Sequence, residues 1–179
     1  MKIGVLGIRG LPAQYGGFET CTQFVSRHWS DEGNQVLIYC RSGLYANKRA
    51  RINGCRLKYK GALPFKSLET LSHTLNCVCD VMFNEKAIRY IHLYNGGNAI
   101  FIPLLRLAGK KVVISIDGIE WKRKKWGLMA RAMHKIGEYF AVKTANIVIA
   151  DNPVVQQYYF NRYGRSVDLI PYGAELLST

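Results

Sequence analysis

Short runs of apolar, mostly β-branched residues alternate along the chain with longer segments whose apolar positions recur at helical spacing. The runs predict seven strands, over residues 3–8, 35–40, 56–59, 90–94, 111–116, 146–150 and 167–170. The longer segments predict helices over residues 18–30, which Gly33 terminates, over 68–83, and from Pro153 to Gly164. This alternation is typical of βαβ units. We therefore expect one α/β domain with a doubly wound, mostly parallel sheet of about seven strands.

The segments that follow the predicted strands are polar or rich in glycine. They comprise residues 9–19 after the first strand, 95–98 after the fourth, 117–121 after the fifth and 151–153 after the sixth. In an open parallel sheet, ligands bind beyond the carboxyl ends of the strands. We therefore expect the functional residues to meet at this edge of the sheet.

Gly16 and Gly17 stand at the start of the first predicted helix. Backbone N–H groups and the helix dipole favour an anion there, and glycine lets a phosphate come close, so a diphosphate would fit. The same pair is also compatible with a tight turn that caps the helix. The dinucleotide fingerprint and the GxxxxGK[ST] phosphate loop are both absent, which argues against NAD binding and nucleoside triphosphate hydrolysis.

Asp117 and Glu120 follow the fifth predicted strand, and the cations at 122–125 come directly after them. Two carboxylates placed in this way can orient or deprotonate a hydroxyl beside cations that hold a charged group. The alternative is structural, with Asp117 capping a helix and Glu120 pairing with the lysines. The histidines and cysteines lack metal-ligand spacing, so we expect no metal and no cofactor. Cys77 and Cys79 are expected to be reduced core residues.

Residues 122–143 are predicted to form a helix whose apolar positions 129, 133, 136 and 140 pack on the sheet. Its start combines two indole rings with four cations: Trp121, Lys122, Arg123, Lys124, Lys125 and Trp126. Rings beside cations are what an interfacial helix presents to anionic lipid. An ordinary surface helix and a membrane contact are therefore both open interpretations of this segment.

The net charge of +13, from 25 basic and 12 acidic side chains, predicts attraction to polyanions such as nucleic acid, phospholipid headgroups or phosphorylated substrates. The longest apolar run has seven residues, 99–105, whereas a transmembrane helix needs about 20. The N-terminal residues also lack the pattern of a signal peptide. We therefore expect a cytoplasmic protein.

Four segments resemble the N-terminal half of bacterial family-4 glycosyltransferases, which have the GT-B fold. They are residues 9–12 with 15–20, 68–75, 117–126 and 170–174. More narrowly, they are similar to rhamnosyltransferase-type enzymes of surface polysaccharide biosynthesis. The resemblance implies that residues 1–179 form a single Rossmann-like, acceptor-side domain, and that a C-terminal donor-binding domain lies outside the chain. Similar enzymes carry in that second domain two glutamates eight positions apart. No two acidic residues of this chain have that spacing, which agrees with the implied absence of the second domain.

The resemblance implies roles for the loop residues as well. Gly16 and Gly17 are expected to face the diphosphate and sugar of the donor. Asp117, at a position that is often histidine in the wider family, is expected to act in catalysis together with Glu120. Contacts with the acceptor are expected from five loop residues: Arg9, Tyr15, Glu19, Asn95 and Trp121.

The expected function is therefore the acceptor-side domain of a retaining glycosyltransferase, inactive by itself. By resemblance alone, its donor is a nucleotide-sugar, dTDP-rhamnose, and its acceptor a lipid-diphosphate-linked saccharide at the inner leaflet of the cell membrane. The competing class is a noncatalytic basic module that binds anionic membrane or nucleic acid. Because the chain has neither an RNA-binding aromatic signature nor helix-turn-helix spacing, no nucleic-acid partner is expected.

Overall fold

An eight-stranded sheet forms the centre of the computed structural model, which describes residues 1–14, 16–65, 68–124 and 126–172. The strand order is β3-β4-β2-β1-β5-β6-β7-β8. The strands are β1 (Lys2–Leu6), β2 (Gln35–Arg41), β3 (Arg51–Ile52), β4 (Cys55–Lys60), β5 (Tyr90–Tyr94), β6 (Lys111–Ile116), β7 (Ile147–Ala150) and β8 (Asp168–Leu169). All neighbours pair in parallel except β3 and β4. The predicted Rossmann-like α/β sheet is thus confirmed.

One strand more than the predicted seven is present. β3 pairs antiparallel with β4, so that Arg51 lies opposite Arg56. Asn53 and Gly54 form the turn between them, with φ angles of 47° and 76°. The Asn-Gly dipeptide marks this turn in the sequence. A strand of two residues, however, is too short to show the alternation from which strands are predicted.

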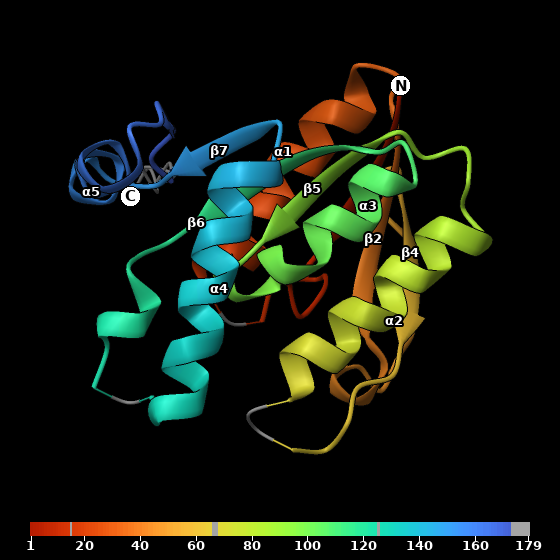
Figure 1. Cartoon of the computed structure of the whole chain (residues 1–179). Helices are drawn as coiled ribbons and strands as arrows, with labels where there is room; N and C mark the ends of the chain where they lie inside the picture. The colour runs from red at the N-terminus through yellow and green to blue at the C-terminus, as the bar shows by residue number, and fades with distance from the viewer. Residues whose placement is uncertain (15, 66–67, 125, 173–179) are drawn as a thin grey trace, which may run out of the picture.

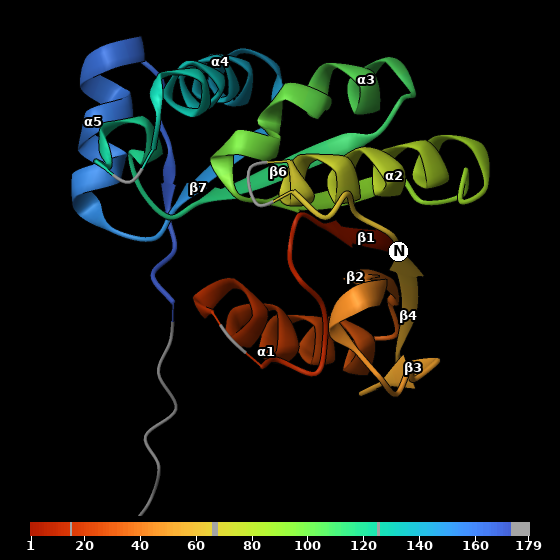
Figure 2. The same ribbon diagram turned by 90° about the horizontal axis from the view of Figure 1, so that it is seen from below.

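The helices lie unequally on the two faces of the sheet. They are α1 (Gly17–Asp31), α2 (Glu69–Phe83), α3 (Ile102–Leu107), α4 (Leu128–Thr144) and α5 (Pro153–Tyr163), with 3-10 turns η1 (Ser42–Leu44), η2 (Gly96–Phe101) and η3 (Glu120–Lys122). Figure 1 looks onto the layer that contains α2, α3 and α4, and Figure 2 shows α1 on the opposite face. Right-handed crossovers explain this arrangement, because the chain passes from β1 to β2 in one direction and from β5 to β8 in the other.

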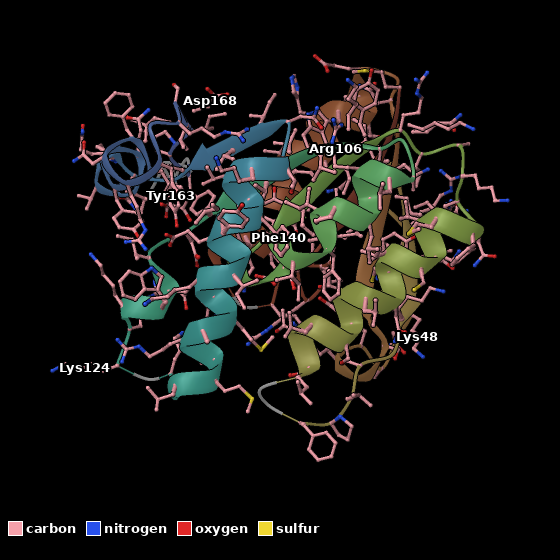
Figure 3. The ribbon with its side chains drawn as sticks, viewed as in Figure 1. Lys48, Arg106, Lys124, Phe140, Tyr163 and Asp168 are labelled. Carbon is pink, nitrogen blue, oxygen red and sulfur yellow. The ribbon has the colours of Figure 1, made fainter. Side chains whose placement is uncertain are left out.

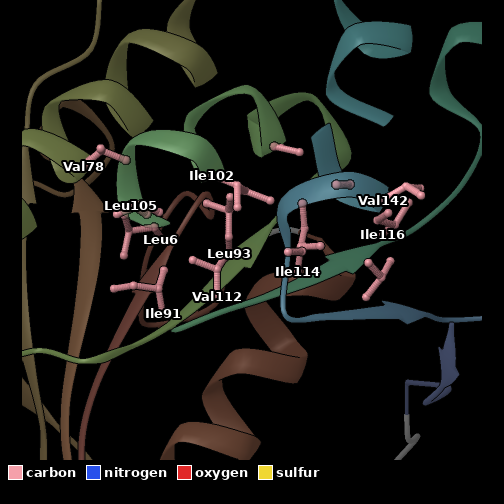
Figure 4. Packing of buried hydrophobic residues seen from close by; sticks show 14 of the residues in the cluster. Leu6, Val78, Ile91, Leu93, Ile102, Leu105, Val112, Ile114, Ile116 and Val142 are labelled. Atoms are coloured by element: carbon pink, nitrogen blue, oxygen red, sulfur yellow. The ribbon is translucent and has the colours of Figure 1, made fainter. Parts of the chain in front are cut away.

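The core has one part on each face of the sheet. Beneath α2 to α5, Ile91 and Leu93 of β5 pack with Ile114 of β6 in a large apolar cluster (Figure 4). Beneath α1, Val5 and Ile38 belong to a second cluster. Parallel strands that are buried on both faces read as continuous apolar runs, which is why most of these strands could be predicted.

Helix α4 differs from the prediction. It begins at Leu128 rather than at residue 122, and Met129 and Ile136 of its predicted apolar face are 81% and 50% exposed. The buried residues include Gly137 and Glu138 instead. A Cβ atom on Gly137 would lie only 2.5 Å from the carbonyl oxygen of Gly96, so the helix approaches η2 along its smallest side chain. Close backbone packing thus decides which face is buried.

The cysteines are free thiols, and three of them, Cys40, Cys55 and Cys77, are buried as expected. Cys79 is exposed, so its predicted place in the core is wrong. Cys77 and Cys79 are two residues apart on α2 and therefore point about 200° apart around the helix axis. In the part of the chain that the structure describes, no helix is long and apolar enough to cross a membrane.

Candidate functional site

The loops after β1, β5 and β6 meet at the carboxyl edge of the sheet and line a cleft of about 660 Å³. The lining residues are Gly7, Arg9, Gly16, Gly17, Phe18, Glu19, Arg41, Glu69, Thr70, Asn95, Asp117, Arg123, Trp126 and Tyr172. Six of them are predicted donor, acceptor or catalytic residues: Arg9, Gly16, Gly17, Glu19, Asn95 and Asp117. The cleft lies where an open parallel sheet places its ligands.

A second cavity, of about 580 Å³, lies near the amino ends of β1 and β2 and includes Lys2, Arg51 and Arg56 in its lining. Its lining contains none of the predicted site residues. We therefore take the carboxyl-edge cleft as the candidate site.

Gly16 and Glu19 shape the glycine-rich wall of the cleft. Gly16 precedes α1 with a φ of 108°, and a Cβ atom on it would lie 2.4 Å from Glu19 Oε2. The other carboxylate oxygen of Glu19 accepts a hydrogen bond of 2.8 Å from the backbone N–H of Arg9. Glu19 is buried in the first turn of α1, and its hydrogen bond to Arg9 connects this turn to the loop after β1.

Gly17 is placed differently from Gly16. The nearest atoms to a Cβ built on it belong to the ring of Tyr172, at 3.7 Å, which is an ordinary contact distance. The same ring packs edge-on against Phe18, with 5.8 Å between the ring centroids. Tyr172 therefore borders the glycine-rich wall, and the start of α1 opens into the cleft beside it.

Asp117 reaches the cleft at the end of β6. Burial raises the pKa of the Asp117 carboxyl above its ordinary value, and the neighbouring charge of Glu120 raises it further. A carboxyl with a raised pKa in a cleft is a candidate for proton transfer or for holding a hydroxyl group.

Glu120 lies behind the cleft wall, where it holds two lining residues. It accepts a hydrogen bond of 2.9 Å from Trp126 Nε1 and forms an ion pair of 2.9 Å with Arg123 Nη1. Glu120 is buried and is not among the residues that line the cleft. The two predicted catalytic carboxylates therefore occupy different places, Asp117 facing the cleft and Glu120 supporting its wall.

Trp121 is not among the residues that line the cleft. Its Nε1 donates hydrogen bonds to Glu138 Oε2 at 3.0 Å and to the Tyr158 hydroxyl at 3.3 Å. The Nζ atoms of Lys135 and Lys122 lie 4.5 Å and 5.6 Å from the centre of its ring. The structure thus places this predicted acceptor contact between α4 and α5, outside the cleft lining.

The predicted membrane segment, residues 121–126, forms hydrogen bonds with other parts of the chain. The indole N–H groups of Trp121 and Trp126 both donate hydrogen bonds to buried carboxylates, and both side chains are half-buried, so contact of these rings with lipid stays a prediction. Lys124 projects away from the body of the molecule (Figure 3). Tyr15 and Lys125, predicted for the acceptor and the membrane, lie outside the described residues.

Several lining residues had no place in the predicted site: Arg41, Glu69, Thr70 and Tyr172. Arg41 ends β2, and its position at the carboxyl end of a predicted strand is the one sequence signal that could have found it. Among the described residues, no group of three or more histidine, cysteine, aspartate or glutamate side chains is arranged to hold a metal ion.

Comparison with known proteins adds a family. A family model described as "Domain of unknown function (DUF1972)" matches residues 1–175. The chain belongs to this family. A search of the curated proteins finds no match to the DUF1972 chain.

Solved structures of GT-B glycosyltransferases share the fold of the DUF1972 chain. Sucrose-phosphate synthase from Thermosynechococcus elongatus has a TM-score of 0.64 at 14% identity, over 98% of this chain and 91% of that chain. HepE of Anabaena, in complex with UDP and glucose, has a TM-score of 0.66 at 15% identity, over 97% of this chain and 45% of that one. Phytolacca americana UGT2, complexed with UDP-2-fluoro-glucose and pterostilbene, has a TM-score of 0.64 at 8% identity, over 99% and 55%.

The DUF1972 chain therefore spans about half the length of the HepE and UGT2 chains. At identities this low the likeness concerns the fold alone. The DUF1972 domain has the Rossmann-like fold of a GT-B half-domain, and its cleft lies at the carboxyl edge of that fold.

Proposed function

We propose that this chain is the acceptor-side domain of a retaining glycosyltransferase that takes its sugar from a nucleotide-sugar. The observation that carries the proposal is the cleft, where a glycine-rich helix start faces a carboxyl whose pKa is raised by burial. The complexes of HepE with UDP and glucose, and of UGT2 with UDP-2-fluoro-glucose, support a nucleotide-sugar as donor.

In this proposal the two walls of the cleft bind different substrates. The N–H groups at the start of α1, at Gly16 and Gly17, attract the diphosphate of the donor. Asp117 accepts a hydrogen bond from the acceptor hydroxyl and so orients it toward the sugar. Glu120 keeps Arg123 and Trp126 in the opposite wall, where it acts as a positioning residue. A C-terminal donor-binding domain outside this chain would complete the site.

The finer assignment is that rhamnose is transferred from dTDP-rhamnose to a lipid-diphosphate-linked saccharide. The sequence resemblance supports it. The test is transfer of radiolabelled sugar to extracted lipid-linked acceptor by the polypeptide of the complete reading frame, with several nucleotide-sugars assayed in parallel. The proposal predicts transfer from one nucleotide-sugar by the complete polypeptide and none by the 179-residue chain. Transfer by this chain alone would contradict the division into two domains.

A specific observation supports peripheral attachment to the inner leaflet through a surface other than the two tryptophans. At the start of α4, Leu128 and Met129 are 85% and 81% exposed, and Lys124 and Lys135 are exposed nearby. Exposed apolar side chains among cations bind anionic lipid surfaces. Figure 1 shows the starts of α2 and α4 at the same end of the molecule, which is the carboxyl edge of the sheet.

Vesicle co-sedimentation tests this attachment. Leu128→Ser with Met129→Ser is expected to weaken binding to vesicles that contain anionic lipid. Leu107→Ser is the matched control, because Leu107 is also 85% exposed but lies at the end of α3. Equal binding by the native chain and the double variant would contradict attachment through α4.

A further inference from the structure

Arg41 is a buried arginine in the wall of the cleft. It is only 6% exposed, although arginine side chains normally reach solvent. Nη1 forms an ion pair of 3.2 Å with Glu69 Oε1, and Nη2 donates a hydrogen bond of 2.9 Å to Thr70 Oγ1. Nε is buried and makes no hydrogen bond. A buried donor without a partner costs free energy, and Arg41 is one of the residues that line the cleft, so an unsatisfied guanidinium lies beside this cavity.

The surroundings of Arg41 are fixed by neighbouring backbone. Its backbone N–H donates a hydrogen bond of 2.8 Å to the carbonyl oxygen of Arg9, which holds the loop after β1 to the end of β2. Glu69 and Thr70 belong to the first turn of α2. We call Arg41, Glu69 and Thr70 the β2–α2 corner. Its three residues belong to a strand and a helix and not to a loop.

An aromatic wall continues from this corner. Trp126 lines the cleft together with the β2–α2 corner. A small cavity of about 80 Å³ adjoins the cleft and shares Thr70, Asn95 and Trp126 with it, while Leu71 and Met133 add apolar surface. Hydrogen-bonding groups beside an aromatic and apolar surface match a sugar ring, which presents hydroxyl groups along its rim and C–H groups on its faces.

The described residues that line the cleft carry balanced charges. Arg9, Arg41 and Arg123 line it together with three carboxylates, Glu19, Glu69 and Asp117. Within the corner, the carboxylate of Glu69 neutralises the guanidinium of Arg41. An anionic ligand would be repelled by Glu69, whereas hydroxyl groups can donate to Glu69 and accept from Arg41.

The histidine beneath the corner adds no charge. His73 lies one turn along α2 from Glu69 and Thr70 and is fully buried. Burial, assisted by the nearby charge of Arg41, lowers the pKa of His73 to about 4, so its ring is neutral near pH 7. Among the described residues, His73 therefore contributes no positive charge that would offset Glu69.

We infer that the β2–α2 corner binds the hydroxyl groups of an uncharged sugar residue of the acceptor, and that it rejects acidic and phosphorylated sugars. This inference rests on the proposed function, because it places the acceptor saccharide in the cleft. The diphosphate of a lipid-linked acceptor then lies outside the corner. Glu69 is the residue that selects against negative charge.

Binding of free saccharides to the 179-residue chain tests the inference without any transfer reaction. The neutral probes are methyl α-L-rhamnopyranoside and methyl α-D-glucopyranoside, and the charged probes are glucuronic acid and glucose 6-phosphate. Binding is followed by changes in backbone amide NMR shifts. Arg41→Lys and Thr70→Val are each expected to weaken neutral-sugar binding by about tenfold, as the loss of a hydrogen bond to a charged group does.

Glu69→Gln separates recognition of charge from a structural effect. It removes the negative charge but keeps a hydrogen-bonding side chain, so the preference for neutral over charged sugars is expected to shrink. The matched controls are the single variants Arg56→Lys and Glu85→Gln. These two residues form an ion pair of 2.6 Å near the other cavity, and both variants should bind neutral sugars as the native chain does. Thermal unfolding confirms that each variant is folded.

Three results would overturn the inference: charged sugars that bind as tightly as neutral ones, no detectable neutral-sugar binding by the native chain, or equal losses in the control variants. Transfer by the complete polypeptide to an acidic acceptor sugar would also overturn it, while leaving glycosyl transfer itself established. Neutral-sugar binding that depends on Arg41, without transfer from any nucleotide-sugar, would instead count against the proposed function and leave sugar recognition by the corner standing.

Discussion

Two adjacent glycines at the start of α1 should respond very differently to the same substitution. Gly16 has a φ of 108° and a ψ of 147°, a region that essentially only glycine occupies. Alanine at this position would also bring its Cβ to 2.4 Å from Glu19 Oε2, and the carboxylate would have to move. Gly17 lies in the helix, and the nearest atom to its Cβ position is 3.7 Å away.

The magnitude follows from two contributions to the free energy of unfolding. Backbone strain at Gly16→Ala costs about 1–3 kcal/mol. Displacing Glu19 weakens its hydrogen bond to the Arg9 N–H, which contributes about 1–2 kcal/mol more. The total of about 2–5 kcal/mol lowers the Tm of a chain of this size by roughly 5–15 °C. Gly17→Ala should stay within about 0.5 kcal/mol of the native chain.

Urea and thermal denaturation of the two variants, measured side by side, provide the assay. Each variant changes one glycine to alanine at neighbouring positions, so differences in composition and in the unfolded chain cancel. Equal stability of Gly16→Ala and Gly17→Ala would refute the assignment of the strained backbone to Gly16.

Three further predictions concern titratable groups. Burial alone would raise the pKa of Asp80, but hydrogen bonds from Lys58, Lys60 and Tyr39 hold this pKa well below its usual range. Asp80→Asn should therefore lower the free energy of unfolding, measured by urea denaturation, by about 3 kcal/mol at pH 7 and by less below pH 4. Burial lowers the pKa of His73 to about 4, so unfolding free energy should fall as the pH drops from about 6.5 to 4, and less steeply in His73→Gln. Because Glu120 helps to raise the pKa of Asp117, Glu120→Gln should move the acid limb of the kcat/KM profile of the complete polypeptide to lower pH.

The sheet could be predicted because its central strands are buried on both faces and therefore read as apolar runs. The presence of a cleft at the carboxyl edge followed from the same prediction, since the carboxyl ends of parallel strands share one edge. β3 and α3 were not predicted, because segments of two and six residues are too short to show a strand or helix period in hydrophobicity.

The contacts inside the site could not be predicted in this way. Arg41 and Glu69 are distant in the sequence, and nothing in either segment indicates that they form an ion pair. The hydrogen bond from Trp121 to Glu138 joins η3 to a face of α4 that the hydropathy pattern assigned to solvent. That face was misassigned because Gly137 packs on the backbone of η2, an effect of shape that hydropathy does not record.

The central claim is that this cleft is one wall of a sugar-transfer site. Radiolabelled sugar transfer by the complete polypeptide tests it most directly when two cleft variants, Gly17→Val and Asp117→Asn, are compared with Arg56→Lys near the other cavity. Our account predicts that both cleft variants lose about 100-fold or more in kcat while remaining folded, and that Arg56→Lys keeps native activity. Native rates in both cleft variants would contradict it.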